Sequence, residues 1–258
     1  PQALVDWICA EQKKRQEQLQ ERFRTFLESE KTKTMVKITP HLTLKDVPLI
    51  EVIHRGKDRP GLLDKITSGL SASKIEILTA RIGDLGKTDI LLDCFMVKYT
   101  LAEGQDWNDV EQLLTEDITD MLENGVAVED IFKRRRPLQK NPHSFPKPKT
   151  ALAVPTEIHF EHTRGRPFTW MEIKTLDWLG LLHALTHILA ERYNINVLSL
   201  STIDTEGYDA QVGKQAVDTL ALALWEKPLP SQLQIILKAD LNWVLPHEVI
   251  DGRMLGPL

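Results

Sequence analysis

Two short stretches of the chain combine an acidic side chain with a glycine in the pattern Asp-x-x-Gly, just before an apolar pattern typical of a helix. The first is Asp58-Arg59-Pro60-Gly61-Leu62-Leu63; the second, about 120 residues later, is Asp177-Trp178-Leu179-Gly180-Leu181-Leu182. Free amides at a helix start attract a carboxylate, and a nearby acidic side chain offers a counter-charge for an ammonium group. The proline of the first stretch fixes its backbone, and the glycine allows close approach of a ligand. Together these groups predict a site for an amino acid.

A purely structural interpretation of the first stretch is also open. In it, Asp58 caps the helix and Gly61 only permits the turn. One copy alone would favour this interpretation, whereas two copies favour ligand binding. The repeat also indicates two related domains, each ordered as strand, Asp-x-x-Gly turn, helix, strand, turn, strand and helix.

Other reactive side chains form weaker constellations. His183 and His187 stand four residues apart, as in zinc proteases, but Ala184 replaces the glutamate that such an enzyme needs. We expect this histidine pair on a helix surface or at the edge of the core. His159 and His162 would lie on opposite faces of a strand, which argues against a shared metal.

Two further patterns bear on catalysis. Asp204 and Glu206 resemble a paired-carboxylate metal motif, but they flank Gly207 in a predicted hairpin, where acidic residues commonly serve the turn. The chain contains no Gly-x-Ser-x-Gly elbow and no phosphate-binding loop. We therefore expect no catalytic residue, no metal and no cofactor in this chain, and we expect it to sense a small molecule rather than to act as an enzyme.

Composition limits the class of protein. The 258 residues, of which 42% are hydrophobic, suffice for about two modest domains. The net charge of −5 gives no reason to expect nucleic acid or an anionic membrane as a partner. Of the two cysteines, Cys9 and Cys94, the second lies in an apolar run, so we expect a buried, reduced thiol in a cytoplasmic protein. The start lacks a signal-peptide pattern, no apolar run suffices for a membrane span, and the missing initiator Met suggests a fragment or a processed chain.

The elements that must position the two turns follow from apolar periodicity. Residues 1–47 should form an amphipathic helix and a lead-in; the helix would pack on its own domain or a dimer mate, or connect to an upstream domain. The first domain, 48–132, should have strands at 48–56, 74–85, 89–99 and 126–132 and helices at 61–71 and 106–123. The second domain, 156–258, should have strands at 156–160, 168–175, 195–203 and 215–224, helices at 180–193 and 231–244, and a disordered tail.

A basic, proline-rich segment at 133–155 separates the two domains. Prolines at this density keep a chain extended, so we expect a linker whose basic cluster is solvated rather than bound to nucleic acid. The order of elements on either side indicates the α+β class. Each domain should be ferredoxin-like, with a four-stranded antiparallel sheet and two helices on one face, and strand 156–160 should take an edge of the second sheet.

The first turn, the strand Ile75-Glu76-Ile77 and the strand residues Asp93-Cys94-Phe95 resemble the ACT domain, a regulatory module that typically binds amino acids between copies. The tandem pair, with its basic spacer and the run Glu172-Ile173-x-Thr175-x-Asp177, is similar over residues 48–244 to the C-terminal region of bifunctional uridylyltransferase/uridylyl-removing enzymes. That family modifies the PII nitrogen signal protein. The resemblance implies a glutamine sensor whose catalytic domains lie upstream.

The resemblance also implies which residues bind the ligand. In the first copy these are Asp58, Arg59, Pro60, Gly61 and Leu62, with Ile75 and Ile77 on the facing strand of the same or a neighbouring copy; in the second they are Asp177, Trp178, Gly180 and Leu181. Because Trp178-Leu179 replaces Arg-Pro and the aromatic ring could fill or cover the pocket, we expect the first copy to be the better site.

The implied partners are glutamine, the upstream catalytic domains of the same protein, the PII signal protein and a second copy of the chain. The alternative is a stand-alone tandem ACT protein that binds another amino acid or serves as a dimerisation module. The presence or absence of upstream catalytic domains in the gene separates these two interpretations.

Overall fold

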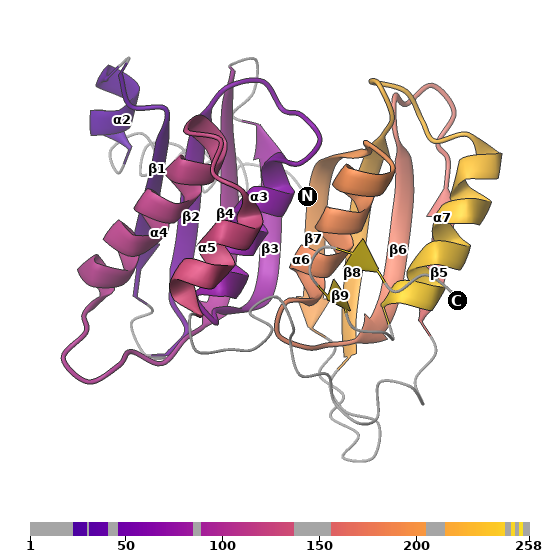
Figure 1. The fold of residues 1–258 in the computed structure, drawn as a ribbon. Helices are drawn as coiled ribbons and strands as arrows, with labels where there is room; N and C mark the ends of the chain where they lie inside the picture. Colours follow the sequence, from indigo (N-terminus) through magenta and orange to yellow (C-terminus); the bar gives the residue numbers. More distant parts are fainter. Residues whose placement is uncertain are drawn as a thin grey trace, which may run out of the picture.

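The computed structural model describes residues 23–29, 31–40, 46–84, 89–136, 156–204, 215–245, 249–250 and 253–254. Within them the chain forms one eight-stranded sheet in the order β1-β2-β4-β3-β7-β8-β6-β5, and every pairing is antiparallel (Figure 1). The strand order of the second half mirrors that of the first. The α+β class is therefore confirmed, in the form of a continuous sheet with most of its described helices packed on one face.

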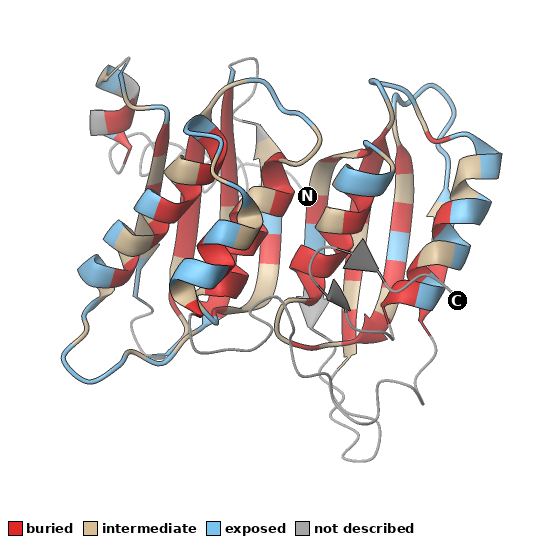
Figure 2. Ribbon diagram, in the orientation of Figure 1, coloured by how far each residue is buried: buried red, intermediate tan, exposed pale blue. Residues whose placement is uncertain are grey.

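The first half follows the apolar patterns closely. Its elements are β1 (Thr34–Thr39), β2 (Leu49–Arg55), α3 (Leu62–Ala72), β3 (Glu76–Asp84), β4 (Ile90–Lys98), α4 (Trp107–Glu123) and α5 (Val128–Arg135). Helix α4 begins at a capping box, in which Asp106 accepts hydrogen bonds from the helix start and Asp109 accepts from the backbone of Asp106. Buried residues line the sheet-facing sides of the helices, and exposed residues cover their outer sides (Figure 2).

The strand expected at 126–132 is wrong. This segment forms helix α5, which has Glu129 and Asp130 in its first turn and three basic residues in its last, an arrangement that complements the helix dipole. Its apolar residues Ile131 and Phe132 are buried in the core. The outer strand of this half is β1, which lies in the segment predicted as a lead-in.

The basic cluster at the end of α5 is solvated only in part, because Lys133 and Arg134 are exposed whereas Arg136 is buried. Arg134 and Arg135 both bond the buried carboxylate of Asp117 on α4. Arg136 is buried and donates to the carbonyl oxygens of Ser71 and Ala72, the last residues of α3. Arg136 therefore adds a side-chain donor to carbonyl groups at the end of α3, of which that of Ser71 also accepts from the amide of Lys74. The rest of the predicted linker, 137–155, lies outside the described residues.

The second half repeats the order of the first. Its elements are β5 (Glu157–Glu161), β6 (Thr169–Leu176), α6 (Leu181–His187), the π-helix η2 (Ile188–Arg192), β7 (Asn196–Asp204), β8 (Gln215–Ala223) and α7 (Ser231–Val244), followed by a small ladder of β9 (Val249–Ile250) and β10 (Arg253–Met254). Strand β5 takes the sheet edge, as predicted. Equivalent bulges interrupt β3 between Ile77 and Thr79 and β7 between Val197 and Ser199.

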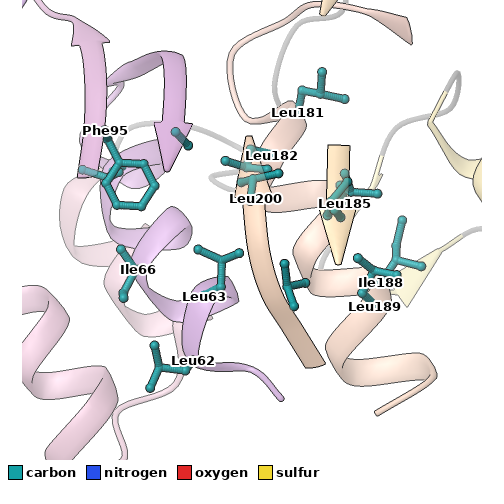
Figure 3. Close-up of a cluster of buried hydrophobic side chains, with 14 of the residues drawn as sticks. Leu62, Leu63, Ile66, Phe95, Leu181, Leu182, Leu185, Ile188, Leu189 and Leu200 are labelled. Carbon is teal, nitrogen blue, oxygen red and sulfur yellow. The ribbon is translucent and has the colours of Figure 1, made fainter. Parts of the chain in front are cut away.

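The two halves meet along a seam formed by β3, β7, α3 and α6. Strands β3 and β7 pair antiparallel at Arg81 with Ser201 and at Ile82 with Leu200. Above them α3 packs on α6, and the loops that start these helices lie at opposite ends of the seam (Figures 1 and 3). The word seam refers to this contact throughout.

The other face of the sheet has a small cluster of its own in the first half. Phe23 and Phe26, next to and within α2 (Arg24–Glu28), pack there with Ile53 and Leu92. Helix α2 is the described part of the helix predicted for the N-terminal region. Cys94 borders the cluster and is half-buried, so it is less buried than expected; Cys9 lies outside the described residues.

Candidate functional site

A small cavity lies at one end of the seam, where the loop between β6 and α6 meets β3 and β8. It is lined by six of the eleven residues that the sequence assigns to ligand binding: Ile75 and Ile77 from the first half and Asp177, Trp178, Gly180 and Leu181 from the second. The Asp-x-x-Gly loop of the second copy therefore faces the strand of the first copy. The facing strand could have come from the same copy or from a neighbouring copy. At this loop it comes from the neighbouring copy, across the seam.

The cavity has a volume of about 20 Å³, enough for about one water molecule and far less than an amino acid needs. Trp178 is only 8% exposed and lines it, so the indole fills space rather than standing open above it. Gly180 begins α6 with φ 90°, a left-handed conformation that favours glycine. A ligand would therefore enter by displacing side chains, with Trp178 the largest of them.

Two carboxylates line the same cavity. Asp177 comes from the loop, and Asp218 comes from the middle of β8. Asp218 is buried and accepts a hydrogen bond of 2.6 Å from the hydroxyl of Thr202 on β7. Sequence reasoning missed Asp218, although a single acid within the apolar strand Ala216-Val217-Asp218-Thr219-Leu220 is an unusual pattern that could have indicated it.

The first Asp-x-x-Gly loop occupies the equivalent place at the other end of the seam. Asp58 and Arg59 are exposed, Pro60 and Gly61 are half-buried, and Leu62 is buried in the core. Leu62 therefore packs, as Figure 3 shows, and does not present its side chain at the surface. The loop also contacts the other half.

That contact is a hydrogen bond across the seam. Asn196, on β7, donates to the Oδ2 atom of Asp58 over 2.8 Å. Gly61 has φ 85°, and a β-carbon built there would meet no heavy atom within 4 Å, so its conformation requires glycine while the space beside it is open. The amide of Leu62 donates to the carbonyl of Arg59, so one of the amides expected to face a ligand closes the turn instead.

Beneath this first loop lies a second buried acid, Asp93 on β4. It is 2% exposed and pairs in register with Ile82 of β3. Burial, followed by the charge of Asp58, raises the pKa of Asp93 to about 8, although a hydrogen bond from the backbone of Gly83 opposes the shift. Asp93 is the counterpart of Asp218, which pairs with Thr202.

The centre of the seam holds a polar cluster between α3 and α6. Asp64 is buried, and its two carboxylate oxygens lie 3.1 Å from the Nδ1 atoms of His183 and His187, one each. The hydroxyls of Thr67 and Thr186 lie 3.0 Å apart beside it. The histidine pair predicted on a helix surface or core edge thus joins the two halves, because its partner acid is on the other helix.

This cluster is strongly coupled. Burial alone would raise the pKa of Asp64, but hydrogen bonds and charge from His183 and His187 outweigh it and lower that pKa to about 2. Burial likewise opposes charge on His187, yet the hydrogen bond and charge of Asp64, with smaller contributions from Glu191 and Glu129, raise its pKa. The carboxylate and at least one histidine therefore stabilise each other's charged forms.

In the part of the chain that the structure describes, no three acidic, histidine or cysteine side chains gather as metal ligands would. The described helices include none with the length and apolar character of a membrane span.

No protein-family model matches the chain. Among solved structures, aspartate kinase from Synechocystis aligns with a TM-score of 0.42 and 14% identity over 81% of this chain and 29% of that one. An unknown protein from Galdieria sulphuraria aligns with a TM-score of 0.24 and 15% identity over 76% of this chain and 89% of that one.

The sequence is 25% identical over 209 residues to the bifunctional uridylyltransferase/uridylyl-removing enzyme of Rhodospirillum rubrum. The match covers 80% of this chain and 21% of that enzyme, so the chain spans about a fifth of the length of this relative. In sequence, the chain is therefore similar to one segment of a bifunctional uridylyltransferase/uridylyl-removing enzyme.

Proposed function

We propose that this chain is a regulatory region that senses an amino acid, with glutamine as the ligand, and that its two halves are ACT domains joined side by side. The observation that supports this most is the convergence of six sequence-assigned residues from both halves at one cavity. The sequence similarity to one segment of a uridylyltransferase/uridylyl-removing enzyme supports a regulatory region. Glutamine as the ligand and nitrogen signalling as the setting are what the family resemblance of the sequence implies.

The types of side chain that line the cavity suit an amino acid. Asp177 and Asp218 provide negative charge for an ammonium group, and Ile75 and Ile77 provide apolar contact for the carbon chain. The exclusion of water strengthens such charge interactions. Because the resting cavity is small, binding must move Trp178 or the loop that carries it. This movement would change the contacts between the two halves at the seam.

Such coupling is what a sensor needs. A ligand that binds with roughly millimolar affinity, or about 4 kcal/mol, changes occupancy as metabolite levels change. A coupling free energy of about 1–3 kcal/mol between the ligand site and a distant activity is enough to switch that activity. In our proposal the coupled activity belongs to catalytic domains upstream in the same cytoplasmic protein, acting on a PII-type protein, and the sensor assembles with a second copy.

A thermal-shift titration with glutamine tests the proposal. Wild type should gain melting temperature with glutamine up to tens of millimolar, because the ligand binds only the folded state. Asp58→Ala and Asp177→Ala should reduce the gain, and the loss with Asp58→Ala should be the larger if the first loop is the better site. Asp130→Ala, at an exposed acid of α5 that pairs with Lys133, is the matched control and should leave the gain unchanged.

No change in melting temperature and no heat of binding at any glutamine concentration would contradict the proposal. The small volume of the cavity favours a second candidate in that case, a stand-alone tandem ACT protein that binds another amino acid or serves as a dimerisation module. A panel of the other amino acids, together with the molar mass in solution, distinguishes those two roles.

A further inference from the structure

The buried acids of β4 and β8, Asp93 and Asp218, occupy equivalent positions but have different partners. Asp218 pairs in register with Thr202, whose hydroxyl donates to it over 2.6 Å. Asp93 pairs in register with Ile82, which has no hydrogen-bond donor in its side chain. The Oδ2 atom of Asp93 is buried and has no hydrogen-bond partner among the described residues.

A buried carboxylate oxygen without a partner is costly, and proteins normally avoid one. The cost is higher here because the charge of Asp58 also acts on Asp93. Asp58 belongs to the first Asp-x-x-Gly loop and its charge reaches Asp93, and a β-carbon built at Gly61 in the same loop would meet no heavy atom within 4 Å. A cationic group of a ligand would satisfy the free oxygen and would also relieve the repulsion between the two carboxylates.

We propose that Asp93 recognises the ammonium group of the ligand at the first loop, together with Asp58, and that the second loop lacks this feature because Thr202 already satisfies Asp218. This inference rests on the proposed function and deepens it, since it assigns a specificity-determining residue and makes the two sites unequal. Asn196, which already donates to Asp58, holds the loop acid in place from the other half.

Binding of an ammonium group at Asp93 should change the number of protons that this carboxyl holds. Because the pKa of Asp93 is about 8, roughly nine in ten molecules carry a proton on this carboxyl at pH 7. An ammonium group beside it lowers the pKa and expels that proton, which is replaced by the charge of the ligand. Binding at the first loop should therefore release close to one proton per ligand.

Calorimetry with glutamine in buffers of different ionisation enthalpy measures this release. Wild type should release about 0.9 proton per ligand at pH 7. Asp93→Asn, which keeps the shape of the side chain, should bind at least tenfold more weakly and release about none. Asp130→Asn is the matched control; it replaces an exposed acid of α5 that pairs with Lys133, and it should change affinity less than threefold and leave the proton release unchanged.

The outcomes separate the two proposals. If wild type gives no heat with glutamine, the proposed function fails and the role of Asp93 fails with it. If wild type binds glutamine without proton release, or if Asp93→Asn binds as well as wild type, the role of Asp93 is wrong while glutamine sensing stands. The wild-type proton count needs no variant, so a folding defect in Asp93→Asn would not leave the question open.

Discussion

Replacing Asp64 tests whether the two halves are held together by charge. Asp64→Asn keeps the size of the side chain but removes the negative charge that faces His183 and His187 across the seam. The pKa of Asp64 falls from its ordinary 3.8 to about 2, which corresponds to a stabilisation of about 2 kcal/mol in the charged state. The acid is 3% exposed, so solvent screens the interaction little. The raised pKa of His187 arises from the same interaction, so it adds no further stabilisation to this value.

The dependence on pH follows from both shifts. A lowered carboxyl pKa contributes stability that is present above pH 3.8 and is lost as pH falls through about 2. A raised histidine pKa contributes stability that is complete below its unfolded value of 6.5 and is lost as pH rises through the higher folded value. The cluster should therefore stabilise the fold most between about pH 4 and pH 6.5.

Urea unfolding at pH 5.5 and pH 9, followed by tryptophan fluorescence, measures the effect. Asp64→Asn should lower the free energy of unfolding by about 2 kcal/mol at pH 5.5 and by clearly less at pH 9. The control is Asp120→Asn, whose partner Arg134 keeps its charge at both pH values, so its effect should not depend on pH. An equal loss for Asp64→Asn at the two pH values would refute the charged cluster, and so would a loss below about 0.5 kcal/mol at pH 5.5.

Three further substitutions test other parts of the structure. Trp178→Ala should lower the free energy of unfolding by about 3–5 kcal/mol in urea titrations, because the indole is buried. It should also enlarge the thermal shift with glutamine, because it makes room in the cavity. An unchanged stability would place the ring outside the cavity. Arg136→Met should cost about 1–3 kcal/mol of unfolding free energy, since the carbonyls of Ser71 and Ala72 lose a buried donor, and hydrogen exchange should speed up at the end of α3 and not in α4. Gly61→Ala should cost about 1–2 kcal/mol by urea unfolding through its backbone alone, since φ is 85° and no neighbour is in the way; a neutral effect would mean that the turn is not left-handed.

Much of the fold was predictable because its elements carry simple periodic patterns. Strands β2 and β4 and helices α3 and α4 match their predicted segments within a few residues, since each presents a regular apolar face to one core. The error at 126–132 has a physical cause. A short run with Val126, Val128, Ile131 and Phe132 fits a strand or one face of a short helix, and only packing against α3 decides between them.

The candidate site was predictable in its loops but not in its buried acids. The glycines of the two turns can be recognised in the sequence because their left-handed conformation restricts the residue type. Asp64, Asp93 and Asp218 each depend on a partner, or on the lack of one, that is distant in sequence: two histidines on another helix, an isoleucine on one strand and a threonine on another. Such pairings appear only when the register of the sheet and the seam between the halves are known.

Isoleucine methyl NMR tests the central claim, that an amino acid binds between the two halves, most directly. With glutamine added to tens of millimolar, the methyl signals of Ile75 and Ile77 should shift, because both side chains line the cavity at the seam. The signal of Ile53, which lies in the separate cluster on the opposite face of the sheet, should stay in place. Shifts at Ile53 without shifts at Ile75 and Ile77, or no shifts at all, would contradict a ligand site at this cavity of the seam.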